Sequence, residues 1–405
     1  MRRGQLRDFF VGVSVKRLSA VDAESKKSNQ HEVNTTRDMR DNFLGDTHRE
    51  ELRVSYVWMG RDQDGFSVPG RATHYDARAR NPDRWPEWRL YYRANPVTDA
   101  MQEGDTLFLA MDRAGCLYFI VAPHGSTSER QLSWLFDLSP IGPEFRAPAL
   151  ADRELDYATR FILDEIGIEL EDPDADKLDN FIEPYGREFP TTAEFSRLAR
   201  RTLPGVRAGD DPDAALIAWI EREEALFRRL ERRIVPERID QGFEADYGTD
   251  VSAFIGFSLS VQNRRKARMG QSLENHLEAI FRSRGIRYVR GAVTENNHRP
   301  DFLFPSAEAY RAAPAAGSPR LAMLGAKSTC KDRWRQVLAE ASKIPEKHLL
   351  TLEPGISERQ TRQMQNSRLQ LVVPQAIQGT YTNDQQAWLL SLEGFIREVR
   401  HRDSG

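Results

Sequence analysis

The sequence predicts an α/β domain, with a mixed central sheet flanked by helices, in the C-terminal half, and an all-β, barrel-like domain before it. Residues 1 to about 140 carry short apolar runs separated by Gly, Pro and Asp, a pattern typical of strands and turns. The C-terminal half instead combines one alternating run with stretches of helical periodicity. We therefore expect domains at residues 1–145 and 183–405, joined by an acidic connector at residues 146–182.

Short apolar runs mark the expected strands of the N-terminal domain: VGVSVKRL, RVSYVWM, RLYYRA, TLFLAMD and CLYFIVAP. The proline-marked stretch PIGPEFRAPAL ends this domain, and YATRFILDEI predicts a short helix at the start of the connector. FPTTAEFSRLARR then opens the helices that lead into the C-terminal domain.

Periodicity predicts the main elements of the C-terminal domain. Ser272 is a good N-cap for the helix LENHLEAIFRSR. Residues 321–329 alternate, so that Lys327 projects from a strand. Over residues 331–343 apolar side chains recur at helical spacing, and Glu340 lies on the opposite side, where it can face the strand.

Three residues of this domain point to chemistry. Asp301 begins a short apolar run after a proline, Lys327 follows 26 residues later, and Glu340 comes 13 residues after that. Taken singly, these are a turn, a solvated lysine and a surface glutamate. Together they offer oxygen ligands for Mg²⁺ and a cation that can position water beside a phosphodiester. The combination predicts a metal-dependent nuclease site.

The charge distribution agrees with a polyanionic substrate. The net charge is −3, but residues 251–405 hold 23 Lys and Arg against 14 Asp and Glu, whereas residues 141–250 hold 15 against 27. A basic segment attracts nucleic acid, with an affinity that falls as salt rises. Arg264 and Arg265 belong to the densest basic cluster, which is either a phosphate clamp or a solvated helix start.

Composition also limits where the protein works. No apolar run approaches 18 residues, so no membrane span is expected. Cys116 and Cys330 form neither a disulfide framework nor a zinc motif, and two such cysteines suit a reducing compartment. We therefore expect a cytoplasmic protein.

The C-terminal half resembles the EcoRII-type restriction endonucleases of the PD-(D/E)xK superfamily. The resemblance rests on FPTTAEF, SVQNRRKARMGQSLENHLEAIF, RPDFLFPSAEAY, KSTCKDRWRQVLAEASKI and RLQLVVP. The family uses a permuted motif, in which the second acidic ligand follows the lysine strand, and position 325 is accordingly Gly. The resemblance implies the following roles: Asp301 and Glu340 as metal ligands, Lys327 as the water-positioning cation, Glu274 as a further acidic group, and Tyr310 as a supporting residue.

The resemblance also implies how DNA is read. In this family the residues after the lysine strand contact bases, and here they are Lys331, Asp332 and Arg333. Arg and Lys can donate to guanine, and Asp can accept from cytosine, which implies a short palindromic site containing CC paired with GG. The alternative is a solvated first helical turn. The sequence departs from the family at AWIEREEALF, where base-flipping members carry an Arg followed four residues later by an aromatic residue.

The N-terminal half resembles the effector domain of the same family, a DNA-binding pseudobarrel. KRLSAVDAESKKSNQHE and HYDARARNPDRW match its two DNA-contacting loops. The positions carried over are Lys16, Arg17, His31, Arg78 and Arg84. Each arginine could equally be a surface residue over an aromatic core side chain.

Three classes of protein fit these observations. The first is a Mg²⁺-dependent type II restriction endonuclease, autoinhibited by its effector domain, that acts as a homodimer on double-stranded DNA and is paired with a cytosine methyltransferase. The second is a DNA-binding regulator without catalysis, and the third is a nicking or repair nuclease. The intact Asp301, Lys327 and Glu340 argue against the second class.

Overall fold

The computed structural model describes residues 4–23, 31–60, 65–81, 83–150, 152–170, 175–245, 248–331 and 333–404. The chain forms two compact units. The N-terminal unit comprises residues 2–170 with 354–359, and the C-terminal unit comprises residues 171–353 with 360–405. The predicted connector, 146–182, is therefore divided between the two units.

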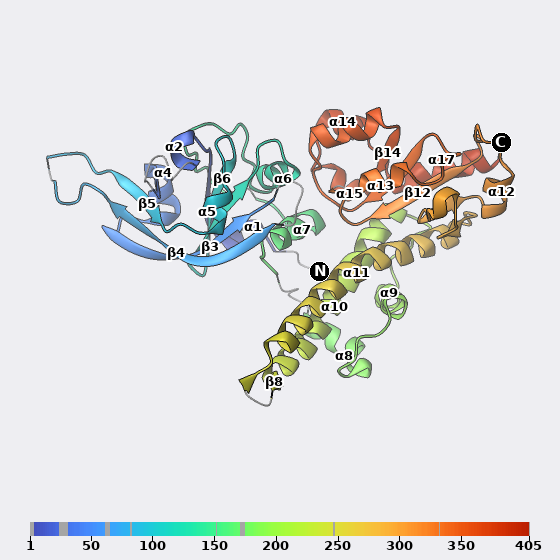
Figure 1. Ribbon diagram of the computed structural model, residues 1–405, viewed down its shortest axis with the longest axis horizontal. Coiled ribbons are helices and arrows are strands. Elements are labelled where there is room, and N and C mark those ends of the chain that lie inside the picture. Colours follow the sequence, from blue (N-terminus) through green and yellow to red (C-terminus); the bar gives the residue numbers. More distant parts are fainter. Residues whose placement is uncertain are drawn as a thin grey trace. The chain divides into compact units, whose positions relative to one another are not determined.

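A seven-stranded sheet organises the N-terminal unit, in the order β1-β6-β7-β3-β4-β5-β2. Figure 1 labels β3, β4, β5 and β6 of this sheet. All neighbouring strands are antiparallel except β3 and β7, which are parallel. The strands are β1 (Phe10–Arg17), β2 (Glu32–Asn34), β3 (Arg49–Trp58), β4 (Phe66–Asp76), β5 (Trp88–Tyr92), β6 (Thr106–Asp112) and β7 (Cys116–Ala122).

Both faces of this sheet are buried. One core contains Tyr56, Tyr92 and Phe119, and the other contains Phe10 and Phe108. The second core includes side chains of α6 (Thr127–Phe136) and α7 (Tyr157–Glu165). Shorter helices are α1 (Leu6–Phe9), α2 (Ala20–Ala23), α4 (Arg37–Met39) and α5 (Pro96–Ala100).

The expected strands are present, but the unit is mostly β rather than all-β, because α6 and α7 complete one of its cores. Within the described residues, β1 and β2 stand at opposite ends of the strand order and do not pair with each other. Closure into a pseudobarrel therefore stays a prediction. The sequence pattern missed β4, which contains Pro69 and Gly70, residues that are rare inside strands.

A five-stranded mixed sheet, in the order β10-β11-β12-β13-β14, forms the centre of the C-terminal unit. β10, β11 and β12 are antiparallel, whereas β12, β13 and β14 are parallel. The strands are β10 (Val289–Arg290), β11 (Phe302–Phe304), β12 (Ala322–Lys327), β13 (Lys347–Thr351) and β14 (Leu369–Val372). The mixed sheet flanked by helices agrees with the predicted α/β class.

Long helices precede this sheet. α9 (Thr192–Arg201) packs with α10 (Pro212–Asp240) and α11 (Val251–Ser283), and the latter two lie side by side (Figure 1). The predicted helix start at Ser272 is wrong, because α11 begins at Val251, capped by Asp250, and Ser272 lies inside it. The basic cluster of residues 264–268 is therefore in mid-helix.

The region after β12 also differs from the prediction. Among the described residues of the expected helix over 331–343, only α13 (Trp334–Leu338) is helical. The chain leaves the helix before Ala341, whose φ of 47° is left-handed. The remaining helices are α8 (Asp179–Ile182), α12 (Ala307–Ala312), α14 (Glu358–Asn366), α15 (Gln375–Gln378), α16 (Asn383–Trp388) and α17 (Leu392–Ser404).

Among the described residues, no helix is both long and apolar enough to cross a membrane.

Candidate active site

Asp301 and Lys327 meet where β11 and β12 lie side by side. Asp301 immediately precedes β11, whose first residue, Phe302, pairs with Leu324 of β12. The Asp301 carboxylate accepts hydrogen bonds from the Ala326 backbone N–H at 2.7 Å and from the Lys327 Nζ at 2.8 Å. Both side chains are partly exposed, at 14% for Asp301 and 20% for Lys327, so a substrate can reach the pair.

Glu340 approaches the same place from the turn after α13. Burial, together with the negative charge of Asp301, raises the pKa of Glu340 to about 7, while the charges of Lys327 and Lys347 oppose this. Its Oε2 atom is buried and has no hydrogen-bond partner among the described residues. A buried acceptor without a donor is costly unless a ligand satisfies it.

The close packing around Gly325 explains why Glu340, and no acidic residue of β12, comes near Lys327. Gly325 lies two residues before Lys327, on the face of β12 that α13 covers. A Cβ at this position would come within 2.9 Å of Val337 Cγ2, which real structures essentially never show. An acidic side chain therefore has no room on the strand, and Glu340 comes near Lys327 from the next segment instead.

Glu274 is the third acidic residue near Asp301. It lies on α11, and burial and the charge of Asp301 raise its pKa, whereas Arg290 and Lys327 lower it. The Arg290 guanidinium holds this carboxylate through Nη2, at 2.8 Å from Oε2. The structure thus brings Asp301, Lys327, Glu340 and Glu274 together.

Tyr310 is close by but has a different environment. It is 3% exposed, and its hydroxyl donates to Glu295 Oε2 at 2.6 Å and accepts from the Lys343 backbone N–H at 3.3 Å. Burial and the bond to Glu295 raise the pKa of Tyr310 to about 12. Because Ser342 N–H also donates to Glu295, Tyr310 supports the turn that carries Glu340.

A divalent metal ion fits this arrangement. Among the described residues, no group of three or more His, Cys, Asp and Glu side chains is close enough to hold a metal by itself. Asp301 and Glu340 are close enough for the charge of Asp301 to raise the pKa of Glu340, and the Glu340 Oε2 atom has no donor among the described residues. Carboxylate oxygens are the ligands that Mg²⁺ prefers, and it usually takes only one or two of them with water and substrate phosphate.

Part of the C-terminal unit is similar in sequence to known proteins. Residues 227–396 match the family model described as EcoRII C terminal. The C-terminal unit is thus similar to the EcoRII C-terminal domain over these residues. Over 218 residues the chain is 41% identical to the type II restriction enzyme EcoRII of Escherichia coli. That alignment covers 54% of this chain and 52% of the relative, so the chain spans about half the length of the curated relative it matches.

Solved structures of restriction endonucleases also resemble the chain at low identity. A structure of metal-depleted Ecl18kI with uncleaved, modified DNA has a TM-score of 0.46 at 18% identity and covers 57% of this chain and 85% of that chain. A complex of the restriction endonuclease PspGI with substrate DNA has a TM-score of 0.44 at 14% identity, covering 53% and 94% respectively.

The predicted base-reading residues follow β12, the strand that ends at Lys327. Lys331 is half-buried with a φ of 29°, and Arg333 is exposed at the N-terminus of α13. Asp332 lies outside the described residues. A short α13 leaves Arg333 next to a loop rather than inside a long helix.

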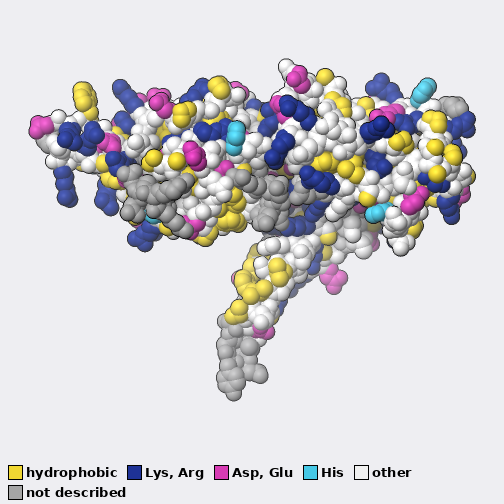
Figure 2. All heavy atoms as spheres, turned by 45° about the horizontal axis from the view of Figure 1, so that its top comes forward, with side chains coloured by type: hydrophobic (Ala, Val, Ile, Leu, Met, Phe, Trp, Pro, Cys, Tyr) yellow, Lys and Arg dark blue, Asp and Glu magenta, His cyan; other side chains and the backbone are white. Residues whose placement is uncertain are grey.

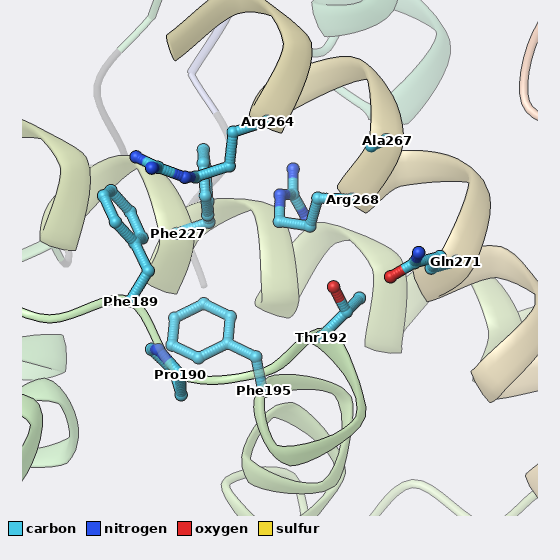
Figure 3. A pocket seen from close by; sticks show the side chains of 9 residues that line it. All are labelled: Phe189, Pro190, Thr192, Phe195, Phe227, Arg264, Ala267, Arg268 and Gln271. Atoms are coloured by element: carbon cyan, nitrogen blue, oxygen red, sulfur yellow. The ribbon is translucent and has the colours of Figure 1, made fainter. Parts of the chain in front are cut away.

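The two arginines of the predicted phosphate clamp differ in their surroundings. Arg265 forms an ion pair with Glu231 of α10 at 2.5 Å. Arg264 instead lies over the ring of Phe189, 4.3 Å from its centroid, at a cavity of about 110 Å³ that Phe195 and Phe227 also line (Figure 3). The charge of Arg265 is thus neutralised within the unit, whereas Arg264 contacts an aromatic ring.

Most of the predicted DNA contacts in the N-terminal unit have intramolecular partners. Lys16 pairs with Asp22 at 2.8 Å, and Arg17 pairs with Glu129 at 2.5 Å. His31 is half-buried, with its ring edge toward Tyr92 at 6.2 Å between centroids. Arg78 pairs with Glu87, and Arg84 is exposed. The structure does not bring these residues into one cluster of free cations.

Arg290 and Glu295 also contact residues of the site, and no pattern in the sequence predicts them. Arg290 contacts Glu274, and Glu295 connects Tyr310 to the turn after Glu340. Both lie between α11 and β11, in a stretch with few apolar residues that indicates only turns. A single arginine in a two-residue strand has no periodic signal, so only its contacts reveal it.

Proposed function

We propose that this chain is a Mg²⁺-dependent type II restriction endonuclease that makes double-strand breaks at a short palindromic DNA site containing CC paired with GG. The observation that carries this proposal is the convergence of Asp301, Lys327 and Glu340 at the end of β12. The match of residues 227–396 to the EcoRII C-terminal family supports it.

In this mechanism Asp301 and Glu340 would hold the metal ion. When bound, a divalent cation would supply positive charge for the scissile phosphate and would lower the pKa of water. Lys327 Nζ, held by Asp301 at 2.8 Å, positions the attacking water and stabilises negative charge on the phosphate oxygens. Glu274 adds negative charge beside Asp301, and Tyr310 fixes the turn that carries Glu340.

Base recognition is assigned to Lys331, Asp332 and Arg333. An arginine can donate to O6 and N7 of one guanine, a lysine can donate to a second guanine, and an aspartate can accept from cytosine amino groups. Exposure of Arg333 beside the catalytic strand supports this role. Arg264 and Arg265 are proposed to contact phosphates. A phosphate would have to compete with Glu231 for Arg265, but not for Arg264, which lies over the ring of Phe189.

A palindromic site calls for a homodimer, because two copies related by a twofold axis read identical half-sites. Exposed apolar side chains on the first half of α11 support association through the C-terminal unit: Val251, Phe254, Ile255 and Leu259. Hydrophobic side chains are visible along the α10 and α11 hairpin in Figure 2. One active site for each strand then yields a double-strand break.

The N-terminal unit is proposed to be an effector domain that inhibits cleavage until it binds a copy of the site. Lys16, Arg17, His31, Arg78 and Arg84 are its proposed DNA contacts. The acidic excess of residues 141–250 supports inhibition, because it can compete with DNA for the basic residues 251–405. The full chain should cut a plasmid with two sites at least tenfold faster than one with a single site. Equal rates would contradict autoinhibition.

Digestion of supercoiled plasmid tests the proposed activity. With Mg²⁺ we expect linear DNA whose sequenced ends all fall at one CC/GG-containing motif, and with excess chelator we expect intact plasmid. Nicked circles alone would indicate the nicking or repair nuclease, and site-specific binding without any cleavage would indicate the DNA-binding regulator. A paired cytosine methyltransferase should protect the same motif, because a cell must shield its own DNA from such an enzyme.

A further inference from the structure

Arg290 is held beside the catalytic strand by its backbone. It is the second residue of β10, and it pairs with Phe302, the neighbour of Asp301. The next residue, Gly291, donates its backbone N–H to the Asp301 carbonyl at 3.1 Å. The position of Arg290 relative to Asp301 is therefore fixed by the sheet.

The guanidinium of Arg290 reaches from this sheet to α11. Its Nε donates to Glu274 Oε2 at 2.9 Å, and Nη2 lies 2.8 Å from the same oxygen. Its Nη1 donates to Asn275 Oδ1 at 2.9 Å and to Glu278 Oε2 at 3.2 Å. All three nitrogens are thus used to hold one face of α11, and the side chain is only 29% exposed.

Glu274 needs such a partner because of the groups that face it. Asp301, just before β11, repels the Glu274 carboxylate, and Lys327, the last residue of β12, attracts it. Lys327 is already hydrogen-bonded to Asp301. A Glu274 carboxylate without Arg290 would be a second acceptor for the Lys327 ammonium, and it would draw the lysine away from the place where it meets water and phosphate.

We propose that Arg290 is a positioning residue for DNA cleavage that acts through Glu274. It holds the Glu274 carboxylate against α11, so that the Lys327 ammonium stays hydrogen-bonded to Asp301. This inference rests on the proposed nuclease function. Arg290 itself does not touch the reacting atoms. Its guanidinium geometry suits the task, because it binds Glu274 with two nitrogens and still reaches Asn275 and Glu278.

A double-mutant cycle with the full chain tests this role. The proteins are the wild type, Arg290→Gln, Glu274→Gln and the double variant, with Glu278→Gln as the matched control. Glu278 contacts the same guanidinium but lies one helical turn from Glu274. Single-turnover cleavage is measured at saturating Mg²⁺, DNA affinity is measured by gel shift without metal, and the thermal unfolding midpoint is measured for each protein.

We expect Arg290→Gln to lower the cleavage rate at least tenfold when Glu274 is present and less than twofold when residue 274 is already Gln. DNA affinity should change less than threefold, and Glu278→Gln should keep at least a third of the wild-type rate. An equal loss in both backgrounds would make Arg290 merely structural and overturn the proposal. An Arg290→Gln protein with the wild-type rate would also overturn it.

The unfolding midpoints separate this proposal from the nuclease function. If the wild type cuts no DNA, the proposed function fails, but the same proteins still measure the coupling between Arg290 and Glu274. Arg290→Gln should then lower the midpoint at least twice as much in the wild-type background as in the Glu274→Gln background. Equal shifts would overturn the positioning role independently of cleavage.

Discussion

Two groups of carboxylates in the C-terminal unit are arranged in opposite ways. At the candidate active site, Glu340 and Glu274 are held near Asp301, and burial and this repulsion raise the pKa of both. The nearby cations, Lys327 and Arg290, offset the repulsion only in part. The site therefore stores unfavourable negative charge, and a bound cation would relieve it.

The other group lies between α10 and α11 and is neutralised. Although burial opposes ionisation, the charges of Arg268 and Arg228 bring the pKa of Glu224 down to about 2. Glu223 is fully buried, and His276 Nε2 lies 2.9 Å from its Oε2 atom. Burial lowers the pKa of His276, which favours its neutral form as a hydrogen-bond donor. The comparison teaches that the carboxylates between α10 and α11 lie beside cations that lower their pKa, whereas those at the candidate active site lie beside another carboxylate that raises it.

The largest effect is expected from Lys327→Ala. Removing the ammonium should lower the cleavage rate about a thousandfold, because the attacking water loses the cation that positions it. DNA affinity in a gel shift should stay within threefold of the wild type, since one lysine near one phosphate contributes little to total binding. Cleavage at the wild-type rate would show that the active-site group has been wrongly assigned.

Substitutions in the group between α10 and α11 should change the stability of the protein rather than the rate of DNA cleavage. Arg268→Met leaves Glu223 and Glu224 without their shared cation and should lower the free energy of unfolding by about 3 kcal/mol, measured with urea. Arg282→Met is the matched control, because the Arg282 side chain is 71% exposed and its pair with Glu278 should contribute under about 1 kcal/mol. Similar losses of unfolding free energy in the two variants would show that Arg268 does not stabilise the buried carboxylates between α10 and α11.

Arg333→Ala should separate base reading from phosphate contact. Loss of a guanine contact should weaken binding to the cognate duplex by about 1–3 kcal/mol and leave binding to a scrambled duplex nearly unchanged. Gel shifts on both duplexes at fixed salt measure the difference. Equal weakening on both would mean that Arg333 contacts phosphate and that the CC/GG assignment is wrong.

The smallest effect is expected in the pH dependence of stability without metal. Because the pKa of Glu340 rises from 4.5 to about 7 on folding, the folded state keeps this proton to higher pH, and the contribution of Glu340 to stability falls between these values. Glu340→Gln should therefore be more stable than the wild type at pH 8, by about 1–2 kcal/mol, although it does not cut DNA. Below pH 4.5 the two proteins should unfold alike, and a constant difference across this range would argue against a raised pKa.

Local patterns predicted the positions of Asp301 and Lys327 well. The alternation of residues 321–329 depends only on neighbouring residues, and Lys327 lies on a strand as expected, although β12 ends there and not at residue 329. Glu340 also reaches the site, but from a turn, because its local periodicity could not reveal the left-handed Ala341. Patterns that depend on two or three neighbours are thus reliable for element type and less so for element ends.

Long-range contacts were beyond prediction from a single sequence. Arg290 binds Glu274 of α11, 16 positions earlier in the chain. Glu295 accepts a hydrogen bond from Ser342, which lies 47 positions later in the turn after Glu340. The acidic partners of Lys16, Arg17 and Arg265 could not be predicted from the sequence either. These basic residues, which were expected to contact DNA, form ion pairs in the structure. The sequence indicates which residues carry charge, but only the fold shows which charges are neutralised.

The response of thermal stability to Mg²⁺ tests most directly whether the active-site carboxylates are held together for a cation. At pH 8, raising Mg²⁺ should raise the unfolding midpoint of the wild type, because a ligand that binds only the folded state stabilises it. The same titration should leave Glu340→Gln and Asp301→Asn nearly unchanged. Equal Mg²⁺ stabilisation of all three proteins, or none for the wild type, would contradict the assignment of Asp301 and Glu340 as metal ligands.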